Sequence, residues 1–244
     1  MHAHRTLHRW SITSPTEIRA CVDGALASTD NGVDRARLID LMGAVQGSND
    51  LLMLIAADPD EALAARIAAI GALGERADTK VKVTLKRLSS VDDLVGAHAC
   101  LALSDLEMLS LPAARRQNTG LRIAQLVLTT GLDEQLSLGG RGDTGGVASL
   151  LVSLGEALAG RADVDSVLTI GRGAVADTLT AATTHSDSSL AYAMIAVGDQ
   201  VRTAETPDDS WEHLPSIKRG LRRVMRQTMP VDMLHLRMAD AGTL

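Results

Sequence analysis

The chain has 244 residues, of which 45% are hydrophobic and 22% are charged, so we expect a globular protein of one large or two small domains. Its formal net charge of −6 and isoelectric point of about 5.6 argue against a general nucleic-acid binder, which normally presents a basic face. The two cysteines, Cys21 and Cys100, form no CxxC motif. They indicate neither a disulfide scaffold nor a structural zinc site, and they fit a reducing, cytoplasmic location.

The N-terminal residues have no apolar stretch of signal-peptide length, and no apolar run reaches the roughly 18 residues of a membrane span. His2, His4 and His8 are close enough in sequence to be drawn as a metal cluster. A solvated, frayed N-terminus is the simpler interpretation, so we predict no metal. We expect small-molecule partners, no nucleic acid and no membrane span.

The first 120 residues are predicted to alternate helices with short strands. Ser14–Glu17 has the pattern of a capping box with proline at the first helical position, which predicts a helix over about 15–28. The apolar run 51–56 and the alternating residues 80–87 predict strands. A Rossmann-like companion layer is therefore expected over 1–120. The other elements expected in this half are helices at 33–46, 58–74, from 90 and at 110–118, and a strand at 100–103.

The second half shows the same alternation after a polar linker near 116–121. Strands that alternate with helices predict parallel sheets with helices on both faces. The expected fold class is therefore α/β with Rossmann-like sheets, and a second Rossmann domain is expected over 121–244. Its predicted elements are strands at 122–129, 167–170, 190–197 and 232–237, and helices at 147–159, 173–183 and 209–227.

The sequence GGRGDTGG at 139–146 carries the strongest functional signal of the chain. Its glycines let the backbone approach a ligand closely, and the helix that follows offers free N–H groups to an anion. A tight turn without a ligand is the alternative. Ligands of parallel sheets bind outside the carboxyl ends of the strands. The loop after strand 122–129 and the residues after strand 232–237 are therefore expected at one edge.

Four features in order resemble the N-terminal domain of retaining GT-B glycosyltransferases, in the branch of sucrose synthase and sucrose-phosphate synthase. They are DTGG at 143–146, the apolar helix that ends at Ala159, WEHLP at 211–215 and HLRMADAG at 235–242. The resemblance covers about residues 135–244. It implies transfer of a hexose from a nucleotide sugar, such as UDP-glucose, to a sugar or sugar-phosphate acceptor, without a metal or another cofactor.

The resemblance also implies which residues contact the substrate, although it assigns no catalytic residue. Two positions depart from the family pattern: Val147 stands where glutamine is frequent, and Arg237 replaces the second histidine of the final motif. An arginine can hold a phosphate or a carboxylate through two hydrogen bonds, but it cannot act as a neutral imidazole. The implied substrate-binding residues are Arg141, Thr144, Gly145, Gly146, His235 and Arg237.

Residues 34–120 resemble part of the GT-B donor domain more faintly. Glu107, within ALSDLEMLSLP, matches the first glutamate of the family's donor-binding pair, whereas Arg115 occupies the partner position. The order of the two domains is inverted, and the family continues beyond the point that corresponds to Leu244. The expected fold is therefore an incomplete GT-B-like one. A fragment, a split gene product, a degenerate paralogue and a site completed by a second chain are the alternatives.

Two other functions compete with glycosyl transfer. A catalytically inactive GT-B-like binding or interaction module fits the departures at Arg115, Val147 and Arg237. A nicotinamide or flavin enzyme is less favoured, because GGRGDTGG is not a GxGxxG motif close behind a predicted strand and neither Asp163 nor Asp165 closes a predicted strand. Hydrolysis by a serine nucleophile has little support, because the chain has no GxSxG motif.

Overall fold

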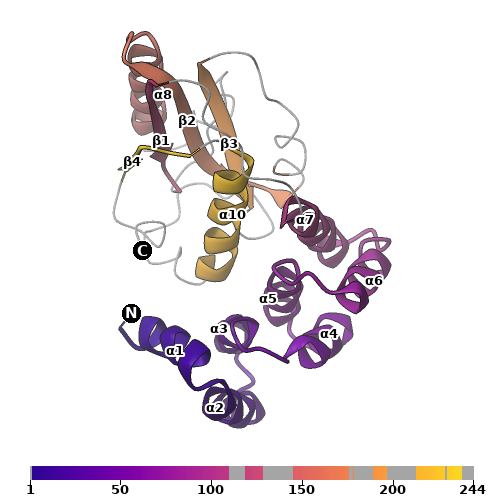
Figure 1. The fold of residues 1–244 in the computed structure, drawn as a ribbon. Coiled ribbons are helices and arrows are strands. Elements are labelled where there is room, and N and C mark those ends of the chain that lie inside the picture. Colours follow the sequence, from indigo (N-terminus) through magenta and orange to yellow (C-terminus); the bar gives the residue numbers. More distant parts are fainter. Residues whose placement is uncertain are drawn as a thin grey trace. The chain divides into compact units, whose positions relative to one another are not determined.

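A computed structural model shows that the chain forms two compact units, Met1–Leu111 and Pro112–Leu244 (Figure 1). The fold is mixed α/β, and the all-parallel sheet of the second unit confirms the expected Rossmann-like class. No helix in the described part of the chain combines the length and apolar character that crossing a membrane requires. The structure describes residues 2–109, 119–128, 145–175, 178, 189–196, 213–228 and 230–237.

The first unit is built from helices packed in successive pairs. The helices α3, α5 and α7 contact one another in that order, while α4 packs on α5 and α6 packs on α7. Because α3, α5 and α7 begin at residues 32, 63 and 94, the spacing is 31 residues each time. This is the arrangement of a helical repeat, in which each pair covers the apolar side of the next. The helices are α1 (His2–Thr13), α2 (Pro15–Ser28), α3 (Gly32–Gly43), α4 (Asn49–Ala57), α5 (Leu63–Leu73), α6 (Thr79–Leu88) and α7 (Leu94–Leu109).

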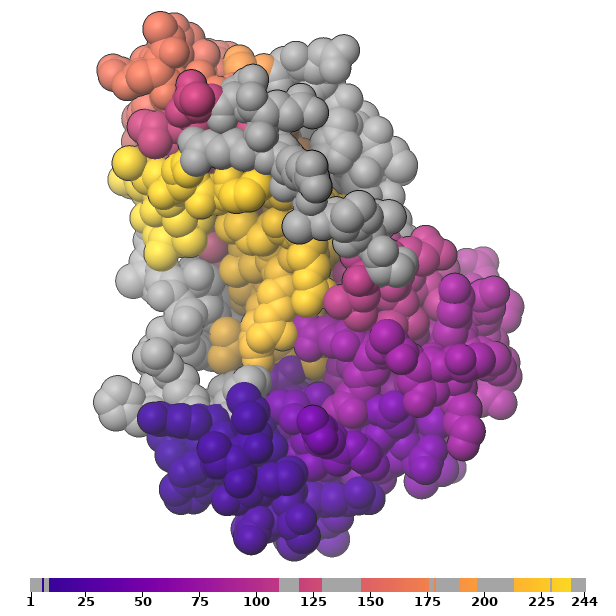
Figure 2. All heavy atoms as spheres, in the orientation of Figure 1, coloured from indigo at the N-terminus to yellow at the C-terminus, as the bar shows by residue number. Residues whose placement is uncertain are grey.

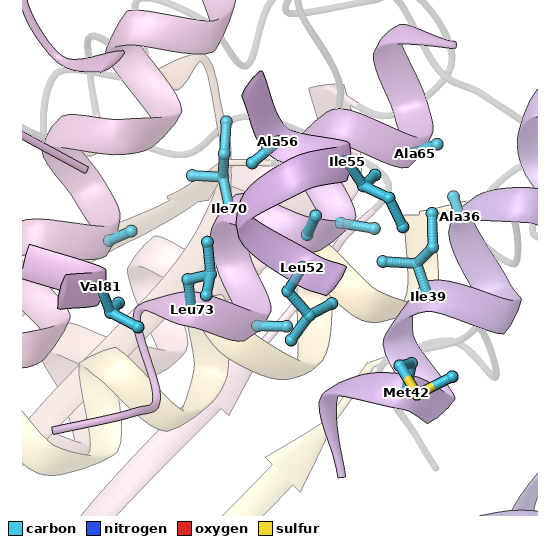
Figure 3. Close-up of a cluster of buried hydrophobic side chains, with 14 of the residues drawn as sticks. Ala36, Ile39, Met42, Leu52, Ile55, Ala56, Ala65, Ile70, Leu73 and Val81 are labelled. Atoms are coloured by element: carbon cyan, nitrogen blue, oxygen red, sulfur yellow. The ribbon is translucent and has the colours of Figure 1, made fainter. Parts of the chain in front are cut away.

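Equivalent residues of successive helices build the core of this unit (Figure 3). Ile39 of α3 and Ile70 of α5 stand 31 positions apart, and both are fully buried. Small residues let the helices approach closely. A Cβ added to Gly43 would lie 2.9 Å from the Cβ of Ala72, which is part of α5.

Arg76, which follows α5, closes the carboxyl end of α3. Its guanidinium donates hydrogen bonds to the carbonyl oxygens of Gly43 at 2.5 Å and Val45 at 2.8 Å. It also donates to the Oγ of Ser48 at 3.0 Å and to the Oδ1 of Asn49 at 2.7 Å. Burial lowers the pKa of Arg76, because it penalises the charged form. The arginine satisfies helix-end carbonyl groups that have no partner within their own helix.

The strands expected at 51–56, 80–87 and 100–103 are wrong, because these residues belong to α4, α6 and α7. In α4, Leu54 is 68% exposed whereas Leu52, Ile55 and Ala56 are buried, which is the pattern of a helix rather than of a buried strand. In α6, Val83 is 63% exposed although its alternating neighbours are buried.

The companion layer expected over 1–120 fails for the same reason, because the described residues of the first unit contain no strand. The N-terminal residues from His2 onward form a helix, α1, and not a frayed end. Ser14 precedes α2 without a capping hydrogen bond from its side chain. The helix predicted at 110–118 lies outside the described residues.

The second unit contains a four-stranded parallel sheet with the order β3-β2-β1-β4. The helix α8 (Gly145–Ala159) packs on Val127, and α10 (Leu214–Gln227) packs on the cluster that contains Leu126. Because neighbouring residues of a strand point to opposite faces, the two helices cover opposite faces of the sheet. The strands confirm the four segments predicted for this half. They are β1 (Leu121–Leu126), β2 (Val164–Gly173), β3 (Leu190–Ala196) and β4 (Met233–Leu236).

Candidate binding site at the carboxyl edge of the sheet

The strand order places a switch point between β1 and β4. From β1 the chain proceeds to β2 and β3 on one side of the sheet, and it returns to β4 on the other side of β1. In open parallel α/β sheets, ligands bind in the crevice outside the carboxyl ends of the strands at such a point. The candidate site is therefore the region beyond Leu126 and Leu236.

Backbone hydrogen bonds fix β4 against β1 at both ends. At the amino end, the N–H of Asp232 donates to the carbonyl oxygen of Arg122 at 2.9 Å. At the carboxyl end, the N–H of Arg237 donates to the carbonyl oxygen of Leu126 at 3.0 Å. The register pairs Gln125 with His235. His235 and Arg237 therefore point to the same face of the sheet as Gln125, because the side chains of a strand alternate.

The first turn of α8 lies on this face. Val127 is fully buried and packs against Val147 and Ala148 of that turn. Arg237 directly follows β4, the strand that pairs with β1. The first N–H groups of α8 have no acceptor within the helix, and the helix dipole makes this end attractive to anions. A Cβ placed on Gly146 would meet no atom within 4 Å. The helix start is therefore open on the side of Gly146.

The edge strand β4 is open to solvent. Met233, Leu234 and Leu236 are all exposed, and yellow atoms of this part of the chain lie at the surface in Figure 2. His235 is half-buried and Arg237 is exposed. An exposed guanidinium on a fixed backbone can turn towards a phosphate or a carboxylate without disturbing the sheet.

Four of the six predicted substrate-binding residues lie at this edge: Gly145, Gly146, His235 and Arg237. Arg141 and Thr144 lie outside the described residues, as does Arg115, and WEHLP is described only from His213. Glu107, the predicted donor-binding residue, is exposed on α7 in the first unit. It is therefore on a helix of a helical repeat and not at the end of a strand of a donor domain.

A polar row that the sequence pattern did not predict crosses the whole sheet. In register, it consists of His235 on β4, Gln125 on β1, Thr169 on β2 and Tyr192 on β3. Gln125 and Thr169 are fully buried, and the Nε2 of Gln125 donates to the Oγ1 of Thr169 at 3.2 Å. A glutamine inside the otherwise apolar run 123–128 was the signal for this row.

Comparison with protein-family models, with curated proteins and with solved structures finds no match for this chain. The resemblance to retaining glycosyltransferases therefore stays a prediction. The topology of the sheet and the residues at its carboxyl edge are the observations on which a function can be argued.

Proposed function

We propose that the second unit binds a sugar phosphate or a nucleotide sugar between β1 and β4, and that the chain is a retaining hexosyltransferase or a part of one. The strand order is the observation that supports this proposal most. It puts the start of α8, which follows β1, at the same carboxyl edge of the sheet as His235 and Arg237 at the end of β4, and this is the edge where parallel sheets bind ligands. The order of DTGG and HLRMADAG in the sequence supplies the resemblance to this class of enzyme.

The proposed chemistry uses hydrogen-bond donors to stabilise developing negative charge. When the bond between the hexose and the diphosphate breaks, charge accumulates on the leaving phosphate oxygens. Backbone N–H groups at the start of α8 and the guanidinium of Arg237 are donors of the kind that stabilise such charge. The imidazole of His235 can form a hydrogen bond with a hydroxyl group of the sugar.

Calorimetric titration of the full chain with UDP, UDP-glucose and glucose 6-phosphate tests the proposal. We expect at least one of these ligands to bind, and we expect the affinity to fall with rising salt because the contacts are ionic. A chain that binds none of the three would overturn the proposal. An assay for free UDP and for the glycosylated acceptor then decides whether binding leads to transfer.

A non-catalytic binding module is the second candidate, and the helical repeat of the first unit favours it. Such repeats present extended surfaces to partner molecules. In addition, Arg237 stands where the resembling family has a second imidazole, so one group that can exchange a proton near neutral pH is absent at that position. Ligand binding without product, across a panel of nucleotide sugars, would favour the module, whereas measurable product would refute it.

A further inference from the structure

The polar row beneath α8 links the helix to the candidate site. Gln125 is fully buried in the central strand β1, and its Nε2 donates to the carbonyl oxygen of Leu151 in α8 at 3.3 Å. The same nitrogen donates to the Oγ1 of Thr169 on β2. A Cβ on Gly155 of α8 would lie 3.1 Å from this nitrogen, so the helix passes directly over the glutamine.

These contacts fix the orientation of the Gln125 amide. A carbonyl oxygen can only accept a hydrogen bond, so the group that faces the carbonyl of Leu151 must be the NH₂ group. The Oε1 of Gln125 therefore points away from β2. It is buried and has no hydrogen-bond partner among the described residues. A buried acceptor without a donor is costly, so a donor within reach is expected to fill this position.

His235 is the polar side chain on the other side of Gln125. It is in register with Gln125 on β4, and both side chains point to the face that α8 covers. Neighbouring strands lie about 4.8 Å apart, which places an imidazole within hydrogen-bond reach of the amide after a rotation of the histidine side chain. His235 is half-buried, so part of the residue remains accessible to solvent.

We infer that Gln125 is a positioning residue for His235: its Oε1 accepts a hydrogen bond from one imidazole N–H. This inference rests on the proposed function for the role of the histidine, but not for the hydrogen bond itself. The hydrogen bond of one ring nitrogen decides which nitrogen carries the proton. The carbonyl of Leu151 thus orients the amide of Gln125, and the amide leaves the other nitrogen of His235 as an acceptor for a substrate hydroxyl.

Nitrogen NMR of the full chain, labelled with ¹⁵N-histidine, tests the hydrogen bond directly. The chain has seven histidines, and a spectrum of His235→Asn assigns the signals of His235. At alkaline pH, where the ring is neutral, we expect a single tautomer in the wild type. We expect Gln125→Met, which has a similar volume but no amide, to mix the two tautomers, so that the two ring ¹⁵N shifts of His235 move towards each other.

Thr169→Val is the matched control, because it removes the other buried partner of Gln125 and leaves both the Leu151 contact and the Oε1 atom in place. We expect it to keep the single tautomer of His235. Comparable amounts of both tautomers in the wild type would overturn the inference, and this measurement does not depend on whether Gln125→Met folds. A spectrum that Gln125→Met leaves unchanged would also overturn it.

Ligand titration separates this inference from the proposed function. We expect the affinity for UDP-glucose to fall several-fold in Gln125→Met and to stay within twofold of wild type in Thr169→Val. A single tautomer in a chain that binds no sugar ligand would leave Gln125 in its positioning role and overturn the proposed function. Tight binding of UDP-glucose together with comparable amounts of both tautomers would overturn the positioning role of Gln125 and leave the proposed function in place.

Discussion

The backbone of Arg237 is bound to the end of β1, because its N–H donates to the carbonyl oxygen of Leu126 at 3.0 Å. Its side chain takes no part in that bond and is exposed. The sheet therefore fixes the backbone of Arg237, while its exposed guanidinium can contact a ligand.

Arg237→Gln is expected to weaken the binding of a phosphate-bearing ligand about 10- to 100-fold, because a hydrogen bond to a charged group contributes about 1.5–3 kcal/mol. The melting temperature should not change, since the backbone hydrogen bond remains. Arg226→Gln removes the same charge from an exposed position of α10 and serves as the control. Equal losses of affinity in the two variants, measured by calorimetry, would argue against a specific role for Arg237.

A carboxylate at the start of α8 is expected to block anion binding while it stabilises the helix. Gly146→Asp adds negative charge to the first turn, which contributes about 0.3–1 kcal/mol to stability through the helix dipole. The same charge repels a phosphate, so we expect at least a tenfold loss of affinity for UDP-glucose. Gly146→Ala is the control, because a Cβ at this position has open space around it. A ligand that binds both variants equally well does not use this helix end.

Close packing between successive helices of the first unit is tested by a pair of glycine variants. A Cβ on Gly74 would lie 2.9 Å from the Cα of Ala102, so Gly74→Ala should lower the free energy of unfolding by about 1–3 kcal/mol. Gly24→Ala adds the same methyl group to α2, where no atom lies within 4 Å. It should instead stabilise by about 0.5–1 kcal/mol. Urea denaturation followed by circular dichroism measures both changes. Destabilisation of both variants, or stabilisation of both, would contradict the packing argument.

The ion pair of Arg35 and Glu61 predicts a pH dependence of stability. The Nε of Arg35 donates to the Oε1 of Glu61 at 2.7 Å, and its Nη2 contacts the Oε2. The hydrogen bond from Arg35 lowers the pKa of Glu61. A pKa that is lower in the folded state gives stability that is present above the unfolded-state pKa and is lost as the pH falls through the folded-state pKa.

In Glu61→Gln, the free energy of unfolding should therefore fall less steeply below about pH 4.3, the ordinary pKa of glutamate. Near neutral pH, the same substitution should lower the free energy of unfolding by about 1–3 kcal/mol. The pair of Arg161 and Asp163 is the comparison, because both of its side chains are more than half exposed. Asp163→Asn should change the acid slope much less, since water screens an exposed pair. Urea denaturation from pH 3 to 7 measures both slopes, and identical slopes would contradict the role of the Arg35–Glu61 pair.

The sequence predicts the sheet unit well, because its strands and helices carry separate signals. The run 122–128 is too apolar for a surface helix, and the glycines before α8 mark where that helix begins. In the first unit the same kind of signal misleads. The run 51–56 is apolar at every position, and such a run cannot distinguish a strand from a buried helix.

The helical repeat is hard to read from the sequence for a physical reason. Gly43 and Gly74 occupy equivalent positions, but the next equivalent residue is Asp105. What recurs is the burial of core positions such as Ile39 and Ile70, because a repeat needs compatible packing between neighbours and not identical residues.

The candidate site could be predicted only in part. The rule for parallel sheets places the ends of the first and last strands at one edge, and His235 and Arg237 do lie there. The role of Gln125 could not be predicted, because it depends on the register between β1 and β4 and on the carbonyl of Leu151 above it. Such contacts arise only when segments distant in the sequence are packed together.

The spacing of 31 residues between α3, α5 and α7 has a consequence for how the first unit comes apart. Each helix pair is held by the pairs on either side of it, and Arg76 binds one pair to the next. An assembly of this kind is held together by contacts between neighbouring helix pairs. It can open from a terminus one pair at a time, and evolution can lengthen or shorten it by whole pairs without redesigning the rest.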